Sequence, residues 1–115
     1  MTKPLTPEEE ALAALLERAS LPRPQARAFA ALARGSGHAA LDLAAATGLS
    51  RQSAADAGNA LELAGLARVE SVASGGRPIR RYHLAGAGLA ALLATRRAAL
   101  ARELAALDEM EARFS

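Results

Sequence analysis

The sequence predicts a mainly α-helical fold with a small β-hairpin (α+β), in which a winged helix-turn-helix is followed by a long C-terminal dimerisation helix. Three observations predict it: a helical pattern interrupted by a tight turn at residues 47–49, an alternating pattern that starts after residue 65, and a helical run without proline over residues 87–114. The 115 residues suffice for one small core and one additional element. We therefore expect a winged helix-turn-helix, with its N-terminal helix, over residues 1–84 and a dimerisation helix over residues 85–115.

Two helices are predicted ahead of the helix-turn-helix. The first begins at Thr6-Pro7-Glu8-Glu9, where threonine can cap the helix, proline suits its first turn and Glu9 completes a capping box. Its acidic first turn is expected to complement the helix dipole rather than to form a metal or catalytic cluster. The second helix runs from Pro24 to Gly35, with Arg27 and Arg34 facing outward. In these helices and in the next one, over residues 41–47, the side chains expected to face the core are Leu12, Leu15, Leu16, Ala19, Ala28, Phe29, Leu32, Ala33, Leu41 and either Ala44 or Ala45.

The middle of the chain has the layout of a helix-turn-helix. Ser50 can cap the second helix, because its hydroxyl accepts from the free backbone N–H groups of the first turn. Gly48 suits the positive φ of the turn and Gly65 the left-handed residue that ends a helix. Leu49 is expected to anchor the turn in the core. We therefore predict a recognition helix over residues 50–64, which such motifs present to the DNA major groove.

A β-hairpin is predicted directly after that helix. Residues 66–72 and 78–84 each alternate between apolar and polar side chains, as half-buried strands do, and turn-forming residues separate them. Arg80 and Arg81 are expected to point to opposite faces of their strand, so only one of them faces DNA. The loop precedes no helix, which excludes a phosphate-binding loop. A hairpin in this place is the wing of a winged helix, and we place its tip at residues 73–78.

The last part of the chain predicts one long helix with a heptad stripe. Leucine or phenylalanine recurs every seven residues, which is typical of a coiled-coil or bundle seam. About 28 residues at 1.5 Å each span roughly 40 Å, more than a domain this small can cover. Arg96 and Glu103 interrupt the stripe, so parallel and antiparallel pairing both stay open. The residues expected at a dimer interface are Leu89, Leu93, Leu100, Leu104, Leu107 and Phe114.

Composition and charge exclude several classes of protein. The chain has no cysteine, so disulfides and thiolate metal sites are excluded, and it has no apolar run long enough to span a membrane. Its polar, acidic N-terminus is unlike a signal peptide, so we expect a soluble cytoplasmic protein. The net charge is −2 over residues 1–20, +4 over residues 21–84 and zero over residues 85–115. A positive middle segment between less basic ends is typical of a nucleic-acid face.

The exposed face of the predicted recognition helix and the wing supply the candidate DNA contacts. Arg51 can donate two hydrogen bonds to guanine and Gln52 can pair with adenine. Asp56 can accept from a cytosine amine or orient Arg51, and both roles stay open. Gly58 is expected to permit a close contact with another helix. The candidate DNA-binding residues are Ser50, Arg51, Gln52, Ser53, Asp56, Asn59, Arg77, Arg80.

No grouping of side chains points to catalysis, a cofactor or a metal ion. His38 and His83 are far apart in the sequence and have no carboxylate at ligand spacing. No serine, histidine and acid grouping suggests a nucleophile, and a small alanine-rich domain has little room for an enclosed pocket. We therefore expect no catalytic residue, no metal and no cofactor, and we expect that the protein is not an enzyme.

With these elements in place, the chain resembles the winged-helix domain of the TrmB family of archaeal and bacterial transcriptional regulators. The stretches that carry the resemblance are L-P-R-P-Q-A-R-A-F-A-A-L-A-R-G, L-A-A-A-T-G-L-S-R-Q-S-A, G-L-A-R-V-E and G-R-P-I-R-R-Y-H-L, all within residues 21–84. The helix from residue 87 resembles the coiled-coil dimerisation helix of that family. Full-length members continue into a sugar-binding domain, so the resemblance implies a minimal form without it. MarR-like and ArsR-like regulators share the same architecture.

These observations together predict a sequence-specific DNA-binding transcriptional regulator, a repressor, that acts as a homodimer on double-stranded DNA. In this hypothesis the recognition helix enters the major groove and the wing contacts the minor groove or the backbone. Two alternatives stay open: a winged helix used as a protein-interaction module, and a MarR-like regulator that responds to a small molecule. The sequence identifies neither the operator nor an effector.

Overall fold

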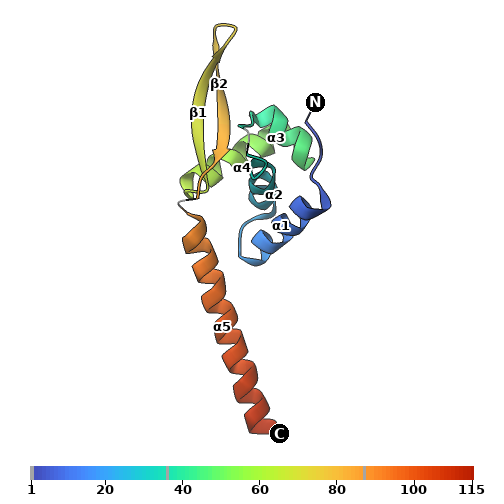
Figure 1. The fold of residues 1–115 in the computed structure, drawn as a ribbon, viewed down its shortest axis with the longest axis vertical. Helices are drawn as coiled ribbons and strands as arrows, with labels where there is room; N and C mark the ends of the chain where they lie inside the picture. Colours follow the sequence, from blue (N-terminus) through green and yellow to red (C-terminus); the bar gives the residue numbers. More distant parts are fainter. Residues whose placement is uncertain (1, 36, 87) are drawn as a thin grey trace.

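The computed structural model describes residues 2–35, 37–86 and 88–115. In chain order its elements are α1 (Pro7–Arg18), α2 (Arg23–Leu32), α3 (Ala40–Thr47), α4 (Arg51–Leu63), β1 (Ala67–Ser74), β2 (Arg77–Leu84) and α5 (Leu89–Phe114). Helices α1 to α4 form a bundle, the hairpin projects from one side of it, and α5 extends away from the base of the hairpin (Figure 1). The whole measures 69 × 25 × 21 Å. The predicted class, helical with a small hairpin and a long last helix, is confirmed.

Helix α1 begins with the predicted capping box and is tied to α2 by ion pairs. The Thr6 hydroxyl accepts from the Glu9 N–H at 3.2 Å, and the Thr6 N–H donates to Glu9 Oε1 at 2.8 Å. Glu9 pairs with Arg34 at 2.8 Å and Glu10 with Arg27 at 2.6 Å. The prediction that these two arginines face outward is therefore wrong: they lie against α1, because its acidic first turn provides their partners. The acidic run joins two helices.

Arg34 is the most highly connected of these side chains. Its guanidinium donates to both Glu9 oxygens at 2.8 Å and to the carbonyl oxygens of Lys3 and Pro4 at 2.7 Å. We expect Arg34→Ala to lower the free energy of unfolding by about 1–2 kcal/mol, because charge-assisted hydrogen bonds are lost. Urea unfolding followed by circular dichroism measures this. The matched control is Arg23→Ala, whose Glu17 pair is 3.9 Å long and largely exposed and should contribute less than about 0.5 kcal/mol.

The same ion pair makes part of the stability depend on pH. Hydrogen bonds from Arg34 hold the pKa of the Glu9 carboxyl at about 2, against 4.5 ordinarily. Above pH 4.5 the carboxyl is ionised in both the folded and the unfolded chain, and its stabilisation is fully present. Between pH 4.5 and about 2 the unfolded chain takes up a proton that the folded chain does not, so this stabilisation is lost. Arg34→Ala should flatten the pH dependence in that window; an unchanged slope would contradict this role for Glu9.

The core is built largely from alanine. Ala26, Ala28, Ala30 and Ala31 of α2 are fully buried among larger residues that include Leu16, Leu32, Leu43, Leu61 and Leu66. Small side chains allow close approach of the helices around α2. They also bury little apolar area per residue, at about 25 cal/mol per Å². The core of one chain is therefore densely packed but small.

Three side chains expected in the core lie at the surface. Leu15 is 48% exposed, Leu41 is 65% exposed, and Ala33 is exposed at the end of α2. In α3 the buried face passes instead through Leu43, Ala46 and Thr47, which follow the i, i+3, i+4 spacing. The prediction of Leu41 as a core residue is wrong because it takes the other face of a short helix that is apolar on several sides.

The turn between α3 and α4 has the predicted geometry. Gly48 has φ +76° and Gly65 has φ +75°, both left-handed, so each ends its helix where glycine is favoured. The Ser50 hydroxyl accepts from the Ser53 N–H at 3.0 Å and caps α4. Leu49 packs against the core. The predicted helix-turn-helix is confirmed.

The wing is a two-stranded antiparallel hairpin. Its register runs from Ala67 opposite Leu84 to Ser74 opposite Arg77, with the turn at Gly75-Gly76. Both turn glycines have positive φ, +57° and +80°, as a two-residue hairpin turn requires. His38 forms an isolated bridge with Tyr82 on the outer side of β2, with N···O distances of 3.0 and 2.8 Å between their backbones. The base of the wing is therefore held by three extended segments.

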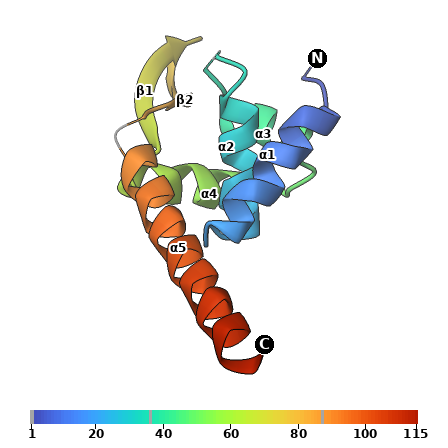
Figure 2. The same ribbon diagram turned by 60° about the horizontal axis from the view of Figure 1, so that its bottom comes forward.

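Helix α5 begins against the base of α4 and then leaves the domain (Figure 2). The Gly88 N–H donates to the Gly65 carbonyl at 2.8 Å, and Leu89 and Leu92 pack on the core. The helix predicted from residue 87 is described from Leu89; residue 87 itself lies outside the described residues. Over its 26 residues α5 has no buried side chain. None of the described helices combines the length and the apolar character needed to cross a membrane.

Candidate nucleic-acid interface

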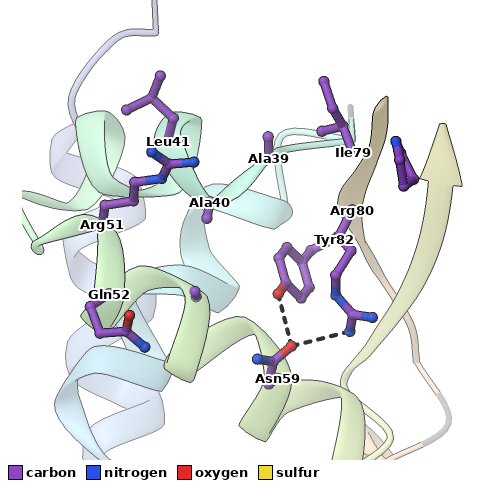
Figure 3. Close-up of a pocket in the computed structure, with 11 residues that line it drawn as sticks. Ala39, Ala40, Leu41, Arg51, Gln52, Asn59, Ile79, Arg80 and Tyr82 are labelled. Atoms are coloured by element: carbon purple, nitrogen blue, oxygen red, sulfur yellow. Dashed lines mark hydrogen bonds between the residues drawn. The ribbon is translucent and has the colours of Figure 1, made fainter. Parts of the chain in front are cut away.

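An open groove of about 930 Å³ lies between the start of α3, the outer face of α4 and strand β2. Figure 3 shows Arg51 and Gln52 on the α4 side of this groove and Ile79 and Arg80 on the β2 side. The exposed start of α4 and the wing strand therefore border the same depression, although they are far apart in the sequence. Of the candidate DNA-binding residues, those that line the groove are Arg51, Gln52, Asn59 and Arg80.

The first turns of α4 present polar side chains to solvent. Arg51 and Gln52 are exposed, and Gln52 Nε2 donates to Asp56 Oδ1 at 2.9 Å across one turn. Among the described residues, the Arg51 side chain has no hydrogen-bonding or ion-pairing partner. Asp56 therefore orients Gln52 and not Arg51. All five guanidinium N–H donors of Arg51 are left for a ligand.

Asn59 and Arg80 join α4 to the wing. Asn59 Oδ1 accepts from the Tyr82 hydroxyl at 2.8 Å and from an Arg80 Nη2 at 3.2 Å (Figure 3). Arg80 also lies 3.6 Å from a Glu62 oxygen and 5.9 Å from the centre of the Tyr82 ring. The sequence does not predict this network. Its one local signal is that residues 80 and 82 share a face of β2, since side chains alternate along a strand.

Arg81 lies on the other face of β2. Its Nη1 donates to the Gly37 carbonyl at 3.0 Å and so holds the strand to the segment before α3. The prediction that Arg80 and Arg81 point to opposite faces is therefore confirmed, and Arg80 is the one at the groove.

Gly58 sets how closely the wing approaches α4. A Cβ atom at this position would lie 2.8–2.9 Å from the ring of Tyr82, which is itself only 2% exposed. The close neighbour of Gly58 is thus the tyrosine of the wing strand, and the expected contact with another helix is wrong. The missing side chain lets β2 lie against the helix that forms the opposite wall of the groove.

The remaining candidates lie beside the groove or beyond it. Arg77 is exposed at the tip of the hairpin, next to the lining residue Pro78. Ser50 caps α4, Ser53 and Asp56 lie on α4, and none of the three lines the groove. Two large apolar side chains also line the groove, and the sequence predicts neither there: Leu41, which is 65% exposed, and Ile79, which is 36% exposed.

Neither histidine lines the groove. His38 is buried at its bridge to β2, and the His83 ring packs over Gly37, with Nε2 3.8 Å from a Glu70 oxygen. In the described parts of the chain, no group of three or more histidine, aspartate or glutamate side chains gathers at metal-binding distance.

The sequence matches no protein-family model and no curated protein, but the fold has close counterparts among solved structures. TrmBL2, an archaeal chromatin protein, superposes with a TM-score of 0.62 at 18% identity over 91% of this chain. The fold is that of winged-helix transcriptional regulators. A MarR-family regulator from Silicibacter pomeroyi aligns with 93% of this chain and 82% of its own length, with a TM-score of 0.56 and 23% identity. A probable transcriptional regulator from Pseudomonas aeruginosa aligns with 94% of this chain and 92% of its own length, with a TM-score of 0.53 and 22% identity. The chain spans 39% of the length of TrmBL2.

Proposed function

We propose that this chain is a sequence-specific DNA-binding transcriptional regulator that acts as a homodimer. The observation that carries the proposal is the groove itself: the exposed side chains at the start of α4 and the wing strand line one depression. A regulator of this fold needs that arrangement, because the helix start enters the major groove while the wing contacts the neighbouring minor groove or backbone. The likeness to TrmBL2, whose structure concerns DNA binding, supports a TrmB-like regulator.

Each part of this surface has a distinct role in the proposal. Arg51 donates to a guanine edge, and the paired Gln52 and Asp56 present a fixed set of donors and acceptors to the next base pair. The α4 N-terminus, capped by Ser50, binds a backbone phosphate. Arg77 contacts the minor groove or its phosphates from the wing tip. Asn59 and Arg80 mainly hold the wing in place, because their polar atoms already bind one another.

The homodimer forms through α5, whose apolar stripe has no cover in one chain. Leu100, Leu104, Leu107 and Phe114 are 44–78% exposed there. Two chains place two copies of the groove on one DNA duplex, so the operator has two half-sites related by two-fold symmetry. We propose repression as the outcome, because a protein bound across a promoter blocks access to it. Expression of a reporter gene placed behind the selected operator shows whether the protein represses or activates transcription.

Selection of genomic DNA fragments by the purified protein tests the proposal. The expected result is a recovered motif with two-fold symmetry and a steep loss of affinity with salt. With about six phosphate contacts per dimer, log Kd should rise with log salt at a slope of about 5. Failure to retain any fragment at about 50 mM salt, where even non-specific binding is strong, would overturn DNA binding.

Leu41 and Ile79 favour a second candidate, a docking groove for a protein segment. Both are apolar and exposed in the groove, and direct readout of DNA uses mainly polar side chains. Leu41→Ser separates the two candidates, since it removes apolar area and keeps every charge. Under the DNA proposal operator affinity stays within about threefold. The second candidate would be favoured if Leu41→Ser lost binding to a protein partner and neither the original protein nor the variant bound DNA.

A further inference from the structure

The two halves of α5 carry opposite charge. Residues 89–102 contain three arginines and no acid, giving +3. Residues 103–115 contain four acids and one arginine, giving −3. The only ion pair within the described part of α5 joins Glu109 to Arg113 at 3.6 Å, in the exposed last turns. The arginines of the first half therefore have no acidic partner along their own helix.

Two of these charges lie on the apolar stripe itself. Leu93, Leu100 and Leu107 are seven residues apart, and Arg96 and Glu103 each follow one of them by three positions. Residues three and seven positions apart share one face of a helix, so these charges belong to the face that a second helix would cover. The orientation of that second helix decides which charges meet.

We infer that α5 pairs with α5 of a second copy in antiparallel orientation, crossing near Leu100. This inference rests on the homodimer of the proposed function and adds its geometry. An antiparallel pair brings Arg96 of each chain beside Glu103 of the other, twice by symmetry. A parallel pair sets arginine against arginine and glutamate against glutamate, which is unfavourable in a seam. The basic first half also lies along the acidic second half only in the antiparallel pair.

The same arrangement matches exposed apolar residues at the two ends. The C-terminal turn of α5 carries Met110 and Phe114, 58% and 78% exposed. In an antiparallel pair it reaches the base of the partner's α5. There Gly88 is bonded to Gly65, and Leu63, at the end of α4, is 90% exposed. A parallel pair carries the two C-terminal turns away from both domains.

The crossing point also sets the separation of the two points at which α5 joins its domain. From Leu89 to Leu100 is about 16 Å along a helix, so these two points are about 33 Å apart in an antiparallel pair. The two domains are therefore held at opposite ends of the helix pair.

Spin-label distances on the intact dimer test the orientation, because the chain has no cysteine of its own. Ala112→Cys lies near the C-terminus, and Ala101→Cys lies near the crossing; both positions are exposed and off the stripe. In the antiparallel pair the two labels at 112 are about 35–40 Å apart and those at 101 about 10–20 Å. In a parallel pair both distances are short. A short distance at 112, or a long one at 101, overturns the inference.

Charge reversal provides a second, independent readout. Glu103→Arg alone and Arg96→Glu alone should each weaken the dimer by about tenfold, because each sets like charges together at both contacts. The double variant Arg96→Glu/Glu103→Arg restores complementarity and should return the dimer dissociation constant to within about threefold. Equal affinities for all four proteins overturn the antiparallel pair and leave DNA binding untouched. A monomer by light scattering overturns the homodimer as well, and the DNA selection reports on binding separately.

Discussion

Replacing Arg51 and Arg77 together by alanine is expected to weaken operator binding by about a hundredfold or more and to leave the fold unchanged. A good bidentate base contact contributes about 1–3 kcal/mol, and a phosphate contact adds a salt-dependent part. A dimer loses each contact twice. Neither side chain has a bonding partner among the described residues, so folding should not depend on them. Fluorescence anisotropy with the selected operator measures affinity, and a thermal melt followed by circular dichroism checks the fold.

A control with the same loss of charge is available on the opposite part of the bundle. Arg18 ends α1 and Arg23 begins α2, and neither residue lines the groove. The junction of α1 and α2 lies at the end of the bundle away from the hairpin (Figure 1). Their double alanine variant should change operator affinity by less than about threefold, since only distant screened charge is removed. Equal losses from both variants would mean that net charge, and not the groove, binds DNA. Unchanged affinity in the Arg51/Arg77 variant would remove the groove from consideration.

Gly88→Ala is expected to lower the free energy of unfolding by about 2–3 kcal/mol. A Cβ atom at Gly88 would overlap the Ala64 carbonyl oxygen and lie 3.1 Å from the Gly65 carbonyl carbon. Because these atoms are backbone, relief requires the start of α5 to move, and the bond from the Gly88 N–H to the Gly65 carbonyl breaks. Urea unfolding measures the loss. In the dimer the altered exit of α5 should also weaken operator binding.

Gly86→Ala is the matched control two residues away. Apart from its chain neighbours, no atom of the described residues lies within 4 Å of a Cβ built at Gly86. Its substitution should change stability by less than about 0.5 kcal/mol, as at ordinary surface positions. If Gly88→Ala behaved like Gly86→Ala, the tight contact between the start of α5 and the end of α4 would not hold in solution.

Local rules explain why so much of the fold could be predicted. Helix caps and left-handed helix ends depend on neighbours within four residues. The sequence therefore predicts the caps at Thr6 and Ser50 and the left-handed Gly48 and Gly65, and the structure confirms them. The alternation of the wing and its phase at Arg80 and Arg81 are equally local. At the site, this was enough to place Arg51 and Gln52 on the exposed start of a helix.

The predictions that failed depend on contacts between distant segments. Arg34 was expected in solvent because its partner Glu9 lies 25 residues away. Leu41 was expected in the core because an alanine-rich helix shows no clear apolar face. The approach of Tyr82 to Gly58 could not be read at all, since it depends on how β2 folds back over α4. Contacts of this kind can be seen only in the three-dimensional structure, because they join residues that are far apart in the sequence.

The strands of the wing must also not pair with strands of other molecules. Within the described residues, the one β-bridge from the hairpin to another segment is at Tyr82, near the base of the hairpin. The outer edge of the distal half of β2 is therefore unpaired. On this part of β2, Pro78 has no backbone N–H to donate, and Arg77 and Arg80 place two positive charges near the edge. Proline and charged side chains at an unpaired strand edge commonly prevent a strand of another molecule from pairing with it. The two arginines of the wing therefore also keep concentrated protein dispersed, and apolar replacements at this edge would promote aggregation.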